Sequence, residues 1–114
     1  MDGNKSGKRN HLTILSPSAA QDLASIYAYT AQWWGYEQAE RYTDLIERAT
    51  QEAADPKTEH VREVEDRPGY LAIMVKWKKA KYSHFVIFRR TDYGAEIVRI
   101  LHSAMDIPSH LEMK

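Results

Sequence analysis

The chain has 114 residues, 16 basic and 16 acidic side chains, and no cysteine. This length suits one domain with a single core, and the absence of cysteine excludes disulfides, a thiolate nucleophile and a cysteine-bound zinc. No apolar run approaches the ~20 residues that span a bilayer, and residues 1–10 lack the apolar stretch of a signal peptide. We therefore expect a cytoplasmic protein without a membrane partner, disordered over residues 1–10 and folded as one domain over residues 11–114.

The charges are unevenly distributed along the chain. Residues 18–56 contain two arginines against seven carboxylates, whereas residues 57–90 contain nine lysines and arginines against four carboxylates. A protein that binds nucleic acid along its whole surface is usually basic overall, so the neutral total argues against that class. The basic half can still form a local face for an acidic partner.

The first predicted elements are a strand and a helix. Residues 11–15 form a short apolar and β-branched run, which is typical of a strand. Ser16 followed by Pro17 marks a helix start, because serine caps a first turn and proline is tolerated at its first position. Ser18 with Gln21 is a competing capping box.

A helical hairpin follows from the apolar spacing. The first helix runs up to Gly35 and has one apolar stripe at helical intervals, formed by Ala20, Leu23, Ile26, Tyr27, Thr30 and Trp34. The second helix covers about residues 36–53, and its apolar face is formed by Ala39, Tyr42, Ile46, Ala49 and Ala53. Asp55-Pro56 ends the second helix, because proline disfavours helical geometry in the residue before it. The connection at Gly35 is so short that the two helices should be antiparallel.

Three strand-like runs occupy residues 70–77, 82–89 and 95–101. Their linkers are short, so we expect an antiparallel meander, and the tail from His102 onward can form one helical turn. The order β-α-α-β-β-β predicts an α+β fold in which a helical hairpin packs on an antiparallel sheet, with a short C-terminal tail.

Metal and cofactor chemistry leave no pattern in this sequence. There is no P-loop, nucleophile elbow or dinucleotide fingerprint. The histidines do not stand at metal-ligand spacings, so we predict no metal site, no cofactor and no hydrolase triad. The five histidines are His11, His60, His84, His102 and His110.

Two groups of side chains are candidates for contact with a partner. The lysine-rich stretch around Trp77 either contacts anionic groups or forms a solvated hairpin tip whose lysines discourage edge pairing; its lysines are Lys76, Lys78, Lys79 and Lys81. Trp33 and Trp34 are adjacent, so on a helix they point about 100° apart. Either one packs under the bend while the other contacts a partner, or both wedge the turn.

Arginines also mark the predicted sheet. Arg89, Arg90 and Arg99 stand on or beside its central strands. An arginine on a half-buried strand usually pairs with a carboxylate or an anion. We therefore expect either an intramolecular ion pair, for example with Asp106, or an anionic partner.

An ordered set of short matches over about residues 12–111 resembles the ParE toxins of the RelE/ParE superfamily. The matches are Leu15-Ser16-Pro17-Ser18-Ala19-Ala20-Gln21-Asp22-Leu23 with Ile26 and Tyr29-Thr30; Trp33-Trp34-Gly35, Gln38-Ala39-Glu40 and Tyr42; Arg67-Pro68-Gly69-Tyr70 and Ser83-His84-Phe85-Val86-Ile87-Phe88-Arg89; and Ile97-Val98-Arg99-Ile100-Leu101-His102, Met105-Asp106 and His110-Leu111. The segment 71–82 is several residues longer than the family's usual connection.

The resemblance implies the toxin of a type II toxin–antitoxin pair, which inhibits DNA gyrase and replication and is not an enzyme. It also implies a ParD-like antitoxin that wraps and neutralises the toxin, so that operator DNA is contacted only through the antitoxin. We expect the gyrase surface to comprise Arg89, Arg99, His102, Met105 and Asp106. We expect the antitoxin to use Tyr29, Trp33, Trp34 and Tyr42, and an acidic antitoxin segment to use Lys76, Lys78, Lys79 and Lys81.

Two other functions are compatible with the same fold. One is a RelE-like, ribosome-dependent mRNA endonuclease, which needs cationic groups and a general acid or base. No tyrosine follows Tyr93 to fill that role, but His102 with Arg89 and Arg99 is a possible acid/base set. The other is a degenerate toxin that only binds its antitoxin.

Overall fold

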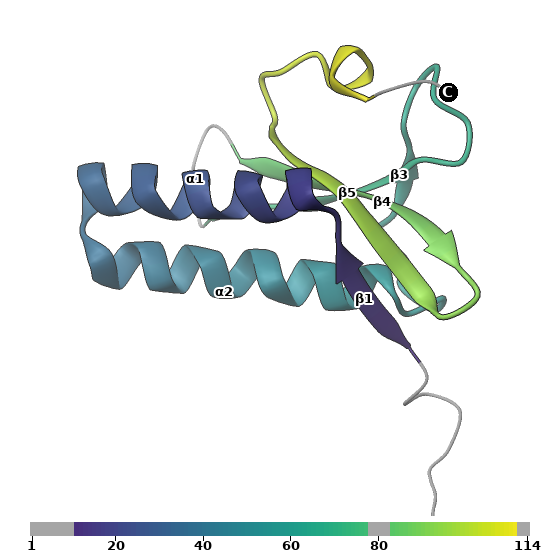
Figure 1. The fold of residues 1–114 in the computed structure, drawn as a ribbon, viewed down its shortest axis with the longest axis horizontal. Helices are drawn as coiled ribbons and strands as arrows, with labels where there is room; N and C mark the ends of the chain where they lie inside the picture. Colours follow the sequence, from purple (N-terminus) through teal and green to yellow (C-terminus); the bar gives the residue numbers. More distant parts are fainter. Residues whose placement is uncertain (1–10, 78–82, 112–114) are drawn as a thin grey trace, which may run out of the picture.

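The computed structural model describes residues 11–77 and 83–111 (Figure 1). Two long helices lie side by side and cross a twisted sheet. The elements are β1 (Leu12–Leu15), α1 (Pro17–Trp34), α2 (Tyr36–Ala53), β2 (Arg62–Glu63), β3 (Leu71–Val75), β4 (His84–Thr91), β5 (Gly94–His102) and the 3-10 helix η3 (Ile107–His110). The α+β class, the helical hairpin and the terminal helical turn are confirmed.

The sheet has the strand order β1-β5-β4-β3-β2. β3, β4 and β5 form the predicted antiparallel meander. β1 instead runs parallel to β5, with Leu12 opposite Gly94 and Leu15 opposite Ile97, so the prediction of a purely antiparallel sheet was wrong in this one strand. The sequence also gave no sign of β2, because a polar two-residue strand has no periodicity to detect.

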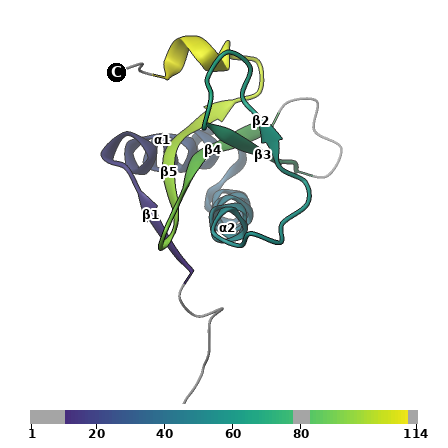
Figure 2. The same cartoon turned by 90° about the vertical axis from the view of Figure 1, so that its right-hand side faces the viewer.

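Each face of the sheet is covered. α1 and α2 lie on one face, whereas η3 and the loop before β3 lie over the other (Figure 2). The core under the helices contains Ala19, Tyr42, Ile46, Ala49, Ala53, Ala54, Ile73, Val75, Val86, Phe88, Ala95, Ile97 and Ile100. The core on the opposite face contains Val64, Ala72, Phe85, Ile87, Leu101, Ile107 and Leu111. The C-terminal segment, residues 103–111, is therefore anchored by apolar burial as well as by its connection to β5.

Ser16 fixes where α1 begins. Its side-chain oxygen accepts a hydrogen bond from the Ala19 backbone N–H at 3.0 Å and donates one to the Val98 carbonyl at 2.8 Å. Pro17 occupies the first position of the helix. The cap predicted at Ser16 is thus confirmed over the competing box at Ser18, and it also joins the helix to β5.

Gly94 allows β1 to approach the β4–β5 turn. Its φ of 144° is strained for other residues, and a Cβ built on it would lie 2.1 Å from the Leu12 carbonyl oxygen. Only glycine fits where two backbones come this close. Within residues 11–77 and 83–111, no helix has the length and apolar character needed to cross a membrane.

Candidate functional site

Four large aromatic side chains are exposed together at the bend between α1 and α2. We call them the bend patch: Tyr29, Trp33, Trp34 and Tyr36, each between 61% and 73% exposed. The rings of Tyr29 and Trp33 lie 6.2 Å apart. The bend projects beyond the end of the sheet (Figure 1), so neither tryptophan packs under it and the expectation that one would do so was wrong.

Tyr36 was missed by sequence reasoning, although an aromatic residue directly after Gly35 was a usable signal. It also lines a hollow of about 360 Å³ together with Tyr27, Ala28, Ala31 and Gln32. The hydroxyl of Tyr27 donates to Glu40 Oε2 at 2.9 Å, and this hydrogen bond raises the pKa of Tyr27. A lining of two tyrosines and two small alanines suits an apolar side chain from a protein partner.

Tyr42 lies apart from the bend patch and is only 8% exposed. Its hydroxyl is 2.6 Å from Nδ1 of His84, and its ring meets Trp77 edge-on. Burial raises the pKa of Tyr42 to about 12. Burial first, and then the charge of His102, lower the pKa of His84 to about 4 despite the opposing effect of Asp22. Neutral His84 can therefore accept a hydrogen bond from the Tyr42 hydroxyl, and Tyr42 is part of the core under the helices rather than of the surface.

The lysine-rich stretch is described only at its start. Lys76 is exposed, and Trp77 packs against the core under the helices. The candidates Lys78, Lys79 and Lys81 lie outside the described residues, as does the segment 1–10 that was expected to be disordered.

The structure divides the residues predicted to contact gyrase between the two ends of β5. Arg89 pairs with Glu96 near the beginning of the strand, whereas His102 ends it and Met105 and Asp106 follow. Glu96 and His102 are six residues apart on the strand, which corresponds to roughly 20 Å. These residues therefore do not form one continuous surface.

Arg99 stands between the two groups and is bound within the molecule. Its Nε and Nη2 donate to the two carboxylate oxygens of Asp22 at 2.7 and 2.9 Å, and the hydrogen bond to Asp22 raises the pKa of Arg99. The partner is thus Asp22, on α1, and not Asp106, as the sequence had suggested. Arg99 is bound to the Asp22 carboxylate, and Arg89 lies at the other end of β5 from His102. The structure therefore does not bring His102, Arg89 and Arg99 together as an acid/base set.

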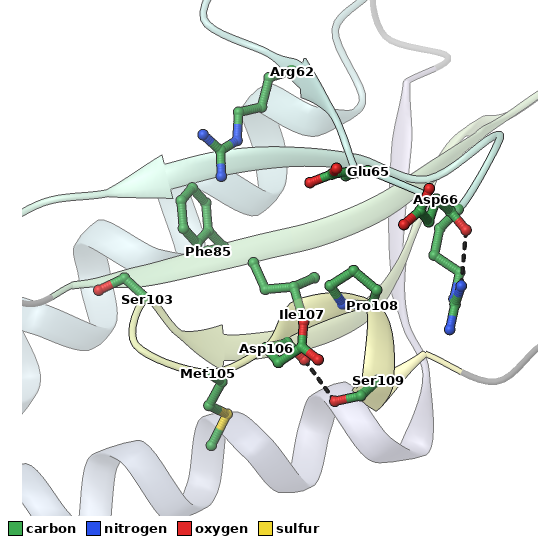
Figure 3. Close-up of a pocket in the computed structure, with 11 residues that line it drawn as sticks. Arg62, Glu65, Asp66, Phe85, Ser103, Met105, Asp106, Ile107, Pro108 and Ser109 are labelled. Carbon is green, nitrogen blue, oxygen red and sulfur yellow. Dashed lines mark hydrogen bonds between the residues drawn. The ribbon is translucent and has the colours of Figure 1, made fainter.

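The C-terminal segment borders a groove of about 540 Å³ on the face opposite the helices (Figure 3). One wall is the loop after β2, and the Arg62 guanidinium lies 4.6 Å from the centre of the Phe85 ring. Met105 and Asp106 line the other wall. The groove combines cations, carboxylates and an aromatic floor, which suits a polypeptide segment. Within the described residues, no group of three or more histidine or acidic side chains could hold a metal ion.

Comparison with known proteins gives consistent matches. The family model for the ParE toxin of the type II toxin–antitoxin system parDE matches residues 13–107. The curated toxin ParE1 of Mycobacterium tuberculosis is 35% identical over 100 residues, which cover 86% of this chain and 95% of that protein. Toxin ParE1 of Caulobacter vibrioides is 33% identical over 97 residues, 85% of this chain and 94% of that protein. A solved chain described as the chromosomal ParDE TA system from P. aeruginosa superposes with a TM-score of 0.60 at 19% identity, covering 81% of this chain and 96% of that chain.

Proposed function

Because the chain belongs to the ParE toxin family of type II toxin–antitoxin systems, we propose that it inhibits DNA gyrase and that a ParD-like antitoxin neutralises it. The inhibition is a binding event without chemistry of the toxin's own. Operator DNA is contacted only through the antitoxin, and the protein acts in the cytoplasm, where gyrase works. The family match over residues 13–107 is the observation that carries this proposal.

The bend patch is the proposed antitoxin contact. Exposed tryptophan and tyrosine side chains contribute most to protein interfaces, because they bury large apolar areas at a small loss of conformational freedom. The adjoining hollow between Tyr27 and Tyr36 can take one apolar side chain of the antitoxin. Lys76, together with the neighbouring lysines outside the described residues, can attract an acidic antitoxin segment.

The proposed gyrase contact is formed by the C-terminal segment, residues 103–111, and by His102 at the end of β5. Its central residues are His102, Met105 and Asp106. Met105 is 45% exposed and Asp106 is exposed, so both are available to a partner. Arg89 and Arg99, also predicted for this surface, are each engaged by a carboxylate. We therefore give them a supporting role and expect their substitution to act through the fold.

Purified gyrase provides the test. The toxin is expected to abolish supercoiling or to trap cleaved DNA, and the cognate antitoxin is expected to reverse either effect. Met105→Ala should weaken inhibition, whereas Met74→Ala should not; Met74 is a matched control because it is 46% exposed but lies on β3. Equal inhibition by both variants would remove Met105 from the surface. No effect of the wild-type toxin on gyrase would leave ribosome-dependent mRNA cleavage, or binding to the antitoxin alone, as the functions to examine.

Antitoxin affinity is measured separately. Trp33→Ala and Trp34→Ala should each weaken binding by about tenfold or more, as expected for aromatic residues at the centre of an interface. Leu12→Ala removes a large exposed apolar side chain on β1, far from the bend, and is the control. Unchanged affinity in both tryptophan variants would refute this docking surface.

A further inference from the structure

β5 continues past the end of its neighbour β1. The pairing of the two strands ends at Leu15 and Ile97, although β5 extends to His102. The backbone groups on this free edge need other partners, because an unpaired polar group that is shielded from water is costly. Ser16 satisfies the carbonyls of Ile97 and Val98.

Asp22 provides the hydrogen-bond partner for the next backbone group along this edge, the N–H of Ile100. Its Oδ2 accepts a hydrogen bond from the Ile100 backbone N–H at 2.9 Å while the same carboxylate holds Arg99. The Asp22 and Arg99 side chains are only 16% and 27% exposed. A bidentate ion pair that is partly buried, as this one is, is among the stronger hydrogen-bonded arrangements in proteins.

Arg99 also donates a hydrogen bond to the C-terminal segment. Its Nη1 lies 3.4 Å from the carbonyl oxygen of His110, in η3. Arg99 thus connects three parts of the molecule: α1 through Asp22, its own strand β5, and η3 through His110. Since Asp22 fixes the plane of the guanidinium, it also fixes the direction of this third donor.

We propose that Asp22 is a positioning residue for the C-terminal segment, residues 103–111. By orienting Arg99, it holds η3 in place over the face of the sheet opposite the helices and so places Met105 and Asp106. This inference rests on the proposed function where it concerns gyrase, because those two residues are the proposed gyrase contact. Asp22 itself does not touch the target in this scheme. The apolar side chains of Ile107 and Leu111 bind the segment to the sheet. Apolar burial is non-directional, so it defines the orientation of the segment less closely than a hydrogen bond from an oriented guanidinium does.

Hydrogen exchange on the full chain tests the placement directly. In Asp22→Asn, the carboxylate fork is lost, and the protected amides of the C-terminal segment should exchange about tenfold faster. The relevant amides are those of Ser103, Met105, Ser109 and Leu111, each hydrogen-bonded to a backbone carbonyl. The amides of α2 should keep their wild-type exchange rates.

Two further variants serve as a second test and as a control. Arg99→Gln retains the bond between Asp22 and Ile100 while removing the link to His110, so it should loosen the segment even if Asp22→Asn folds poorly. Glu96→Gln breaks the comparable pair with Arg89 at the other end of β5 and should leave the segment unchanged. In the gyrase assay, Asp22→Asn and Arg99→Gln should inhibit less while their antitoxin affinity stays at the wild-type value.

The outcomes separate the positioning role from general stability and from the proposed function. Unchanged exchange in the C-terminal segment of both variants would overturn the positioning role. Exchange that rises equally in α2 and in the segment would also overturn it, because it would show an effect on the whole fold. If the wild-type toxin leaves gyrase active, the proposed function fails, while the exchange result still decides whether Asp22 positions the segment.

Discussion

Acidification should destabilise this protein through one histidine. His84 is half-buried on β4, where its Nδ1 lies 2.6 Å from the Tyr42 hydroxyl oxygen and its ring lies 5.3 Å from that of His102. Protonation would place a positive charge in this partly buried site. It would also put a hydrogen on Nδ1, which could then no longer accept a hydrogen bond from the Tyr42 hydroxyl. The folded state therefore resists the proton, and the pKa of His84 falls from 6.5 to about 4.

The sign and size of the effect follow from this difference. Between pH 6.5 and about pH 4, the unfolded chain binds a proton at this position and the folded chain does not, so stability falls as the pH falls. The contribution is complete above the unfolded pKa and is lost below the folded one. At about 1.4 kcal/mol for each pKa unit, the full loss is about 3 to 4 kcal/mol.

Urea unfolding of the wild type and of His84→Gln, at several values from about pH 7 to about pH 4, measures this contribution. Glutamine can still accept from Tyr42 but does not titrate. The free energy of unfolding of the wild type should fall more steeply with acidification than that of the variant. The nearby His102 and Asp22 are present in both proteins, so their titration largely cancels in the comparison. Parallel pH profiles would refute the reasoning.

Three stability predictions can be checked by urea unfolding. Gly94→Ala should cost at least about 2 kcal/mol, because its Cβ would meet the Leu12 carbonyl; Gly69→Ala, whose added Cβ has nothing within 4 Å, should cost less, and equal losses would contradict the steric explanation. Ser16→Ala should cost about 1–2 kcal/mol through the two hydrogen bonds of its hydroxyl; a neutral result would mean that water replaces both. Ile46→Ala, at a fully buried position, should cost about 2–5 kcal/mol by leaving a cavity, and a loss below that range would show that the helices collapse into the space.

The helices could be predicted from the sequence because their burial follows the helical period. All five residues assigned to the inner face of α2 are buried: Ala39, Tyr42, Ile46, Ala49 and Ala53. The corresponding stripe of α1 was less accurate, since Ala20 and Trp34 are exposed. The period specifies which side of a helix is apolar, but not how far the helix extends beyond the sheet that covers it.

The sheet shows the same limit. The meander of β3, β4 and β5 was predictable because short linkers force neighbouring strands to be antiparallel. The pairing of β1 was not, since its partner β5 lies about eighty residues later, a distance over which local patterns carry no information. The last hairpin is also tighter than expected, with Thr91 opposite Gly94, so that Asp92 and Tyr93 alone form the turn.

The candidate site was limited by contacts that are distant in sequence. Tyr42 and Arg99 were assigned to partner proteins, yet they bind His84 and Asp22, which are 42 and 77 residues away along the chain. An aromatic or cationic residue looks the same in a sequence whether its partner is another protein or a distant part of its own fold. The exposure of the bend tryptophans was predictable only in part, because it depends on where the sheet ends.

The two proposed surfaces lie far apart, and this separation constrains how an antitoxin can neutralise the toxin. The bend patch is at the free end of the helical hairpin, whereas η3 lies over the opposite face of the sheet, toward the other end of the molecule (Figures 1 and 2). An antitoxin fragment that covers only the bend would therefore leave Met105 and Asp106 accessible. We expect such a fragment to bind the toxin without restoring supercoiling, and a longer fragment that reaches the C-terminal segment to restore it. A fragment confined to the bend that fully restores gyrase activity would contradict this separation, because it would place the gyrase contact at the bend as well.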